Sequence, residues 1–355
     1  MRIWVDIVTP SQSHLFHALI PELGEKISCI SSTDFAETND LLRKFGIKPD
    51  VIGNHLEKKN LLKYLKVFER LLLLAMWLKN FDVSLSFQNF YAPLTAKFRG
   101  RTNISMFDND IPSFDVRVML RFSDYLLCPK AISVQNLVAH GVDRSKIYQF
   151  DGYKEDIYLA DYVPDPVFLE SLPFRHYVVV RPEALFAIYV HEEETIVPKL
   201  LCSLERECFN VVYLPRCNDD LRYIKGTNAY VPSEPLNGLD LCWHSQAVLT
   251  GSGTLAREAA CMGVPAVSFF PEKLISVDEQ LAKANLLFHT RDPEKITDYI
   301  LKKGKKDRSR YPEETKRVKA QVVLILKQIL SKLNRCKELT RVYYHDVNYV
   351  VRIIG

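Results

Sequence analysis

The sequence predicts an α/β protein with two Rossmann-like domains that face a cleft. Apolar strands alternate with amphipathic helices in the first half of the chain, and the same alternation starts again at residue 177. This order is typical of parallel sheets that carry helices on both faces. The two sets are separated by residues 161–173, whose prolines and broken pattern predict a hinge.

In the first half, short apolar runs predict strands, and apolar residues spaced three and four apart predict helices. The expected strands are residues 3–8, 27–31, 51–52, 83–87, 104–107, 125–128 and 147–150. The expected helices are residues 13–23, 34–45, 61–79, 91–98 and 134–140. Together they predict an N-terminal Rossmann-like domain over residues 1–162.

The second half repeats the pattern. The expected strands are residues 177–180, 210–214, 229–231, 247–249 and a run after Pro265, with helices near 192–205, 254–262 and 292–303. These elements predict a C-terminal, nucleotide-binding domain over residues 163–303. In the remaining tail, residues 304–355, an apolar stripe predicts a helix over 313–333. Residues 342–354 have β character, which favours an edge strand or an interface.

Composition restricts the function only broadly. The 355 residues carry a net charge of +4, which does not indicate a nucleic-acid partner and suits an anionic substrate. None of the eight cysteines has a zinc-site spacing, so we expect free thiols in a reducing cytosol and no metal. We also expect no tightly bound cofactor. The first residues enter a strand at once, which predicts a cytoplasmic protein without a signal peptide.

The most apolar stretch, residues 61–78, contains Lys63, Lys66, Glu69 and Arg70. These charges make a membrane span unfavourable and predict a packed amphipathic helix. The alternative is a face of the helix, formed by residues 71–74 and Trp77, that lies on a membrane surface.

The most informative segment is residues 250–271. A buried strand enters the turn formed by Gly251, Ser252 and Gly253, and a helix follows from Thr254. Backbone N–H groups at such a turn, with the helix dipole, favour an anion such as a diphosphate. Glu258, one turn inside the helix, can reach a ribose diol. The alternative is an ordinary βα turn whose small residues allow close packing.

Several motifs together resemble a family. The chain is similar to the largely archaeal family numbered 354 among domains of unknown function, over residues 1 to about 300. The motifs are those at residues 2–6, 9–14, 35–38, 152–161, 179–182, 214–216, 238–241 and 251–260. That family is distantly similar to the GT-B superfamily, and within it to UDP-N-acetylglucosamine 2-epimerases and lipid II-type glycosyltransferases.

The resemblance implies a UDP-like nucleoside-diphosphate sugar in the cleft, with its ribose held by Glu258. It also implies that residues 1–162 form the acceptor-side domain and that a C-terminal helix crosses back to this domain. The acid/base motifs of the epimerases are replaced here. This chain has residues 9–11, Gln88-Asn89, residues 107–110 and residues 180–182 at those positions. The resemblance therefore favours a retained sugar-nucleotide site with different chemistry.

Two residues are candidates for catalysis. His14 follows the first strand and can act as a general base on an acceptor hydroxyl, or it can be a helix-start histidine bonded to the backbone. Asp108, with Asp110, can orient an acceptor or act as a base, but Asp-Asn-Asp is also common in turns.

The remaining candidates are cationic or lie near the hinge. Arg181 and Arg216 end strands of the second domain, where a guanidinium can bind a diphosphate or form a surface ion pair. Lys154 and Glu155 lie near the hinge and can close the cleft. Arg257 is as well explained as a structural ion-pair partner.

Three functions are consistent with these residues. The first is a glycosyltransferase whose acceptor is unknown and can be lipid-linked at a membrane surface. The second is a sugar-nucleotide epimerase or hydrolase, which needs no acceptor. The third is a binding protein that has the fold without catalysis. The sequence does not determine the oligomeric state.

Overall fold

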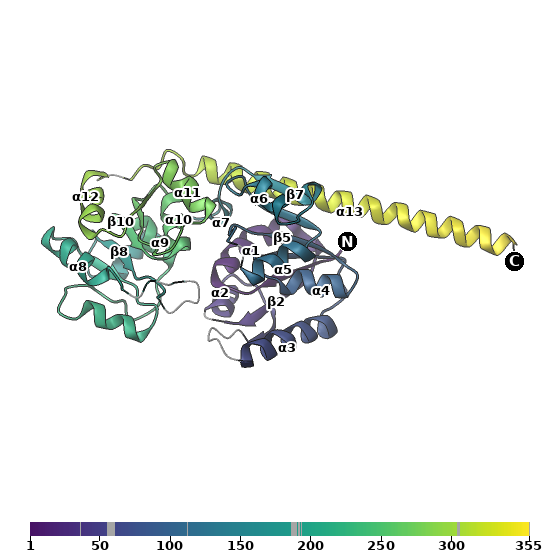
Figure 1. Cartoon of the computed structure of the whole chain (residues 1–355), viewed down its shortest axis with the longest axis horizontal. Helices are drawn as coiled ribbons and strands as arrows, with labels where there is room; N and C mark the ends of the chain where they lie inside the picture. Colours follow the sequence, from purple (N-terminus) through teal and green to yellow (C-terminus); the bar gives the residue numbers. More distant parts are fainter. Residues whose placement is uncertain are drawn as a thin grey trace.

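The computed structural model describes residues 1–35, 37–54, 61–111, 113–185, 190, 192, 194–303 and 306–354. Among them, two parallel sheets confirm the predicted α/β class with two Rossmann-like domains (Figure 1). The first sheet has strand order β3-β2-β1-β4-β5-β6-β7, and the second has order β12-β11-β10-β8-β9. Both orders reverse direction once, as doubly wound sheets do.

The first sheet and its helices account for the chain up to residue 159. Its strands are β1 (Ile3–Ile7), β2 (Ile27–Asp34), β3 (Asp50–Asn54), β4 (Val83–Phe87), β5 (Thr102–Met106), β6 (Tyr125–Pro129) and β7 (Ile147–Phe150). Its helices are α1 (Pro10–Leu23), α2 (Thr38–Lys44), α3 (Leu61–Trp77), α4 (Tyr91–Phe98), α5 (Phe114–Phe122), α6 (Val134–Ala139) and α7 (Lys154–Leu159). Every residue of β1 and β4 is buried, because helices cover both faces of the sheet.

The second sheet follows the same plan. Its strands are β8 (Val178–Arg181), β9 (Val211–Tyr213), β10 (Ala247–Thr250), β11 (Ala266–Ser268) and β12 (Leu287–His289). Its helices are α8 (Val197–Arg206), α9 (Gly238–His244), α10 (Gly253–Cys261), α11 (Ser276–Lys283) and α12 (Pro293–Lys303). The sheets end and begin near the predicted hinge, and we keep 1–162 and 163–303 as the proposed division into domains.

The C-terminal helix α13 (Glu313–Ile354) runs back along the N-terminal domain and extends past it (Figure 1). It packs against α7, β7 and α1. Gln321 accepts a hydrogen bond from the backbone N–H of Asp151 at 2.9 Å, and Lys319 pairs with Asp161 at 2.6 Å. The helix therefore ties the end of the second domain to the first.

The structure corrects several expectations. Helices α5, α7, α9 and α11 and strand β12 were not predicted. The strand predicted at residues 229–231 is wrong, because only an isolated bridge joins Tyr230 to Val212. Residues 342–354 are helical, so the predicted β-rich tail is wrong. The stretch 313–354 contains no glycine or proline, so an established helix can extend through its β-branched residues at small cost per residue. The run of lysines and arginines at residues 302–310 predicts a basic loop, and residues 304–305 of this run lie outside the described residues.

Gly263 allows the link between α12 and α13 to cross the end of α10. Its φ is +70°, and a Cβ there would lie 1.8 Å from the carbonyl oxygen of Asp307. The backbone N–H of Asp307 donates to the carbonyl of Gly263 at 2.9 Å, which fixes this approach.

We expect Gly263→Ala to lower the free energy of unfolding by about 2 kcal/mol or more, because the new methyl group displaces the link. Gly141→Ala is the control, since Gly141 has φ of +84° but open space around its Cα. Backbone strain alone should cost it about 1 kcal/mol. Equal losses for both variants in urea denaturation would contradict the proposed packing role of Gly263.

Candidate functional site

The candidate site lies where the two sheets reverse direction. These points are between β1 and β4 in the first sheet and between β8 and β10 in the second. In doubly wound sheets, the loops after the strands at such points form the ligand site. Most of the residues predicted from sequence belong to these loops or to the helix starts that follow them.

The glycine-rich turn after β10 packs against a neighbouring loop at its first glycine and is partly exposed to solvent at the residues that follow. A Cβ on Gly251 would lie 2.6 Å from Cα of Glu183, so this glycine lets the turn pack against the loop after β8. Ser252 is the N-cap residue of α10, but its side chain makes no capping hydrogen bond. Ser252, Gly253 and Thr254 are all partly exposed. The start of α10 thus keeps backbone donors that a ligand can use.

Arg181 stands beside this turn. It pairs in register with Thr250, and its carbonyl accepts the N–H of Gly251 at 3.0 Å. Its side-chain Nε is buried and has no hydrogen-bond partner among the described residues. Burial lowers the pKa of Arg181, while the carboxylates of Glu37 and Glu258 act in the opposite direction. A buried guanidinium N–H without a partner is costly unless something binds it.

Glu258 connects the second domain to the first. Its Oε1 accepts a hydrogen bond from the hydroxyl of Tyr158 on α7 at 2.7 Å. Burial raises the pKa of Glu258 to about 7, although the Tyr158 hydroxyl stabilises the carboxylate. The Tyr158 ring lies 5.6 Å from the ring of His14 on α1. His14 and Glu258, predicted separately, are therefore separated by one side chain.

His14 is half-buried between aromatic rings. Phe45 packs against it edge-on at 5.2 Å between ring centroids. Burial, with a smaller contribution from His17, lowers the pKa of His14 to about 4. Its imidazole is therefore neutral at pH 7.

A buried cluster of five charged residues joins the two domains. Lys154 Nζ lies 3.4 Å from Asp108 Oδ2 and 3.3 Å from Glu155 Oε1. Arg257 Nε donates to Glu155 Oε1 at 2.9 Å, and its Nη1 donates to Asp278 Oδ1 at 3.0 Å. Arg257 Nη2 lies 3.6 Å from Asp108 Oδ2. We call these residues the interdomain charge cluster.

The opposite charges in the interdomain charge cluster compensate for the cost of burial. Burial opposes the charge of Lys154, but Asp108 and Glu155 outweigh it and raise the pKa of that lysine. Burial likewise opposes the charge of Arg257, and Glu155 and Asp278 raise its pKa well above the usual range. Each cation is thus needed by the carboxylates around it.

Asp110 also bridges the domains. Its Oδ1 accepts the backbone N–H of Ser276 at 3.1 Å, and its Oδ2 accepts the Ser276 hydroxyl. These bonds cap the start of α11 with a carboxylate, which the helix dipole favours. Asp110 therefore has a structural explanation, which the sequence had left open.

Arg216 takes a different position from Arg181. Its Nε donates to the carbonyl of Pro182 at 2.8 Å, and its backbone N–H donates to Asp220 Oδ2 at 2.7 Å. It supports the loop after β8.

Two residues of the site, Tyr158 and Asp278, were not among the candidates from the sequence. For Asp278 a signal was available, because the pattern Ser276-x-x-Glu279 is typical of the start of a helix and would have predicted α11. Arg257 makes the ion pairs that its structural interpretation predicted.

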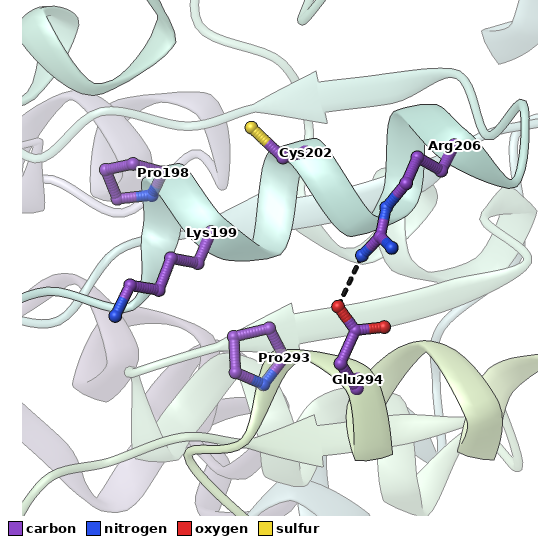
Figure 2. A pocket seen from close by; sticks show the side chains of 6 residues that line it. All are labelled: Pro198, Lys199, Cys202, Arg206, Pro293 and Glu294. Atoms are coloured by element: carbon purple, nitrogen blue, oxygen red, sulfur yellow. Dashed lines mark hydrogen bonds and ion pairs between the residues drawn. The ribbon is translucent and has the colours of Figure 1, made fainter.

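A recess of about 440 Å³ lies elsewhere, between α8 and α12 (Figure 2). Its lining includes Pro198, Lys199 and Pro293, and an ion pair joins Arg206 to Glu294 across it. Most of these side chains are exposed, and the buried polar group they meet, the Ser203 hydroxyl, is already bonded to Glu294 at 3.2 Å, so the recess lacks the features of a ligand site. No group of acidic, cysteine or histidine side chains among the described residues has the arrangement of a metal site.

Comparison with known proteins identifies the family. Residues 1–331 match the model described as "Protein of unknown function (DUF354)". The chain belongs to this family. It is also 27% identical to the uncharacterised protein MJ0665 of Methanocaldococcus jannaschii over 317 residues. This matched region covers 84% of this chain and 91% of that protein. The family resemblance inferred from the motifs is thereby confirmed.

Solved structures show the fold that this DUF354 protein shares. The UDP-GlcNAc 2-epimerase from Neisseria meningitidis, bound to UDP-GlcNAc, has a TM-score of 0.71 at 16% identity, covering 94% of this chain and 100% of that one. The M. jannaschii UDP-GlcNAc 2-epimerase, in complex with UDP-GlcNAc and UDP, has a TM-score of 0.70 at 15% identity, covering 92% and 100%. A glycotransferase of kitacinnamycin has a TM-score of 0.61 at 11% identity, covering 94% and 98%.

Removing the cation at the centre of the interdomain charge cluster should be strongly destabilising. We expect Arg257→Met to lower the free energy of unfolding by about 3–5 kcal/mol, because Glu155, Asp108 and Asp278 lose their shared partner. Arg206→Met is the control, since its ion pair with Glu294 is exposed and should contribute less than about 1 kcal/mol. Chemical denaturation gives both values, and a similar small loss for both would refute the structural role of Arg257.

The lowered pKa of His14 predicts a pH effect on stability. Above pH 6.5 His14 is neutral in both states. Between pH 6.5 and about 4 the unfolded chain takes up a proton that the folded protein does not, so stability falls as the pH falls. In His14→Gln the free energy of unfolding should fall less than in the wild type over this pH range, by at most about 3 kcal/mol at pH 4. If the free energy of unfolding, measured from denaturation curves, changes with pH equally in the wild type and in His14→Gln, then the fold does not lower the pKa of His14.

Proposed function

We propose that this DUF354 protein binds a nucleoside-diphosphate sugar between its two domains and acts as a glycosyltransferase. The observation that carries the proposal is the start of α10, which has no side-chain cap, beside the Nε of Arg181, which has no hydrogen-bond partner in the part of the chain that the structure describes. Backbone donors, a helix dipole and a guanidinium together fit a diphosphate. The three solved structures share the fold, and the two epimerases among them bind UDP-GlcNAc.

In this proposal the diphosphate lies at the N–H groups of Ser252, Gly253 and Thr254. The Ser252 N–H, which donates to Thr250 Oγ1 at 2.8 Å, exchanges that bond for a phosphate oxygen. Gly251 shapes this turn, and Arg181 faces the phosphates from the neighbouring strand. Glu258 accepts hydrogen bonds from the ribose hydroxyls, in exchange for or beside the bond that Tyr158 donates now. In this assignment Arg216 supports the loop that carries Arg181.

In the transfer step, the acceptor oxygen forms a bond to the anomeric carbon of the sugar, and the bond from that carbon to the diphosphate oxygen breaks. The leaving diphosphate keeps the electron pair and is stabilised by donors that are in place beforehand. A base takes the proton of the acceptor hydroxyl.

We assign the base to His14. Asp108, the other candidate, is 5% exposed and already faces Lys154 and Arg257. The negative charge of a bound diphosphate would raise the pKa of His14 towards the neutral range, where a base is most effective. Lys154 and Glu155 hold the two domains together.

The second candidate is an epimerase or hydrolase that acts on the sugar nucleotide without an acceptor. The overall similarity to UDP-GlcNAc 2-epimerases, with TM-scores up to 0.71, favours it. The two reactions differ in their products. Incubation of the protein with UDP-GlcNAc alone yields an epimer or free UDP if the second candidate holds, and neither if transfer to an acceptor is required.

A nucleotide-binding experiment tests the shared part of both proposals. A nucleoside diphosphate at about 100 times its Kd should raise stability by about 2.7 kcal/mol in thermal unfolding. We expect one of UDP, GDP, CDP and ADP to give this shift, and Arg181→Met and Glu258→Gln to lose it. Glu279→Gln, an exposed carboxylate of α11, is the matched control and should keep it. If none of these nucleotides or their sugar conjugates shifts the cooperative transition, the proposed site is wrong.

A further inference from the structure

Helix α3 has two apolar faces, and only one of them is packed. On the inner face, Leu74 and Leu78 are buried in the core of the first domain. Arg70, also on this face, is 1% exposed and donates to Asp6 Oδ1 at 2.7 Å and Oδ2 at 3.2 Å. This bidentate ion pair fixes the rotation of α3 about its axis.

The opposite face is apolar as well. Leu65, Phe68, Leu72 and Met76 recur three and four residues apart, which places them in one line along the helix. Glu69 lies on the same face, three residues before Leu72, and its charge is paired with Lys66. The four apolar residues are between 43% and 66% exposed, and Trp77 beside them is 76% exposed. We call the four residues with Trp77 the outer stripe. Residues 71–74 were expected to form a membrane-facing surface together with Trp77. That expectation is wrong, because consecutive residues of a helix point in different directions and Leu74 is in the core.

Several cations lie near the C-terminal end of α3 in the fold. Arg99 donates to the carbonyl of Leu78 at 2.9 Å, so the end of α4 lies against the end of α3. Phe98, which precedes Arg99, is 81% exposed. Lys79, Lys97 and Arg101 are exposed at the same junction. The single carboxylate of α3, Glu69, is paired with Lys66 at 2.7 Å.

We propose that the outer stripe docks this protein on the surface of a bilayer that contains anionic lipid. A helix that lies in the interface buries an apolar face at the level of the acyl chains and keeps cations at the headgroups, and aromatic side chains are favoured there. No described helix has the length and apolarity needed to cross a bilayer. Figure 1 shows α3 at the outer edge of the N-terminal domain, where a flat surface can reach it.

Charge favours a bilayer over a second copy of the chain. A two-fold dimer through the outer stripe would set the same patch against itself. Lys79, Lys97 and Arg101 would then face their own copies, with no free carboxylate on α3 to offset them. Anionic headgroups complement the same three cations, each of which can contribute about 1 kcal/mol near such a surface.

Vesicle co-sedimentation of the full chain tests the proposal. We expect binding to vesicles of phosphatidylcholine with phosphatidylglycerol, and weaker binding to phosphatidylcholine alone. Phe68→Glu with Met76→Glu should lower the partition coefficient by about tenfold or more, because the apolar contact is lost. Lys97→Gln with Arg101→Gln should remove most of the preference for the anionic vesicles. Leu301→Glu, which changes an exposed leucine of α12, is the matched control.

The same samples separate the alternatives. All variants change exposed positions, so their thermal transitions should match the wild type and report on binding alone. Failure of the wild type to bind either vesicle would overturn the proposal. So would a dimer in light scattering that becomes a monomer in Phe68→Glu with Met76→Glu, because the outer stripe would then be an interface between copies. Neither result depends on whether a nucleotide binds.

Discussion

The ion pairs of Arg257 are the interaction on which the arrangement of this protein depends. Its guanidinium reaches Glu155 on α7, Asp278 on α11 and the loop of Asp108 after β5. Those three elements belong to different parts of the chain, and burial makes each carboxylate depend on the shared cation. These ion pairs therefore help to fix the geometry between the two sheets, together with the apolar core that spans both domains, at the place where loops from both sheets meet.

Helix α7 transmits this constraint to the candidate site. It packs against α1, α10 and α13, and it carries Lys154, Glu155 and Tyr158 within its six residues. Through Tyr158 it places His14 of the first domain near Glu258 of the second. Asp156 on the same helix binds Arg310 with two hydrogen bonds of 2.8 Å, which secures the start of α13. One short helix therefore couples the domain junction, the candidate site and the C-terminal helix.

Sequence patterns predicted the parts of this structure that are set locally. Continuous apolar runs gave the buried strands, and the Gly251-Ser252-Gly253 turn with Gly263 bounded α10 correctly to within one or two residues. Helix α11 was missed because Ser276–Lys283 is mostly polar. Its apolar face consists of little more than Val277 and Leu281, which are buried in the structure but are too few to give a helical pattern in the sequence. The partners at the site depend on tertiary contacts. Tyr158 and Glu258 are 100 residues apart, and no local pattern pairs them.

The central claim is that a nucleoside diphosphate lies at the start of α10, between Arg181 and Glu258. A crystal structure of the protein with UDP tests it most directly. We expect phosphate oxygens within hydrogen-bond distance of the Gly253 and Thr254 N–H groups and of Arg181, with the ribose at Glu258. A nucleotide bound elsewhere, for example in the recess between α8 and α12, would contradict this placement.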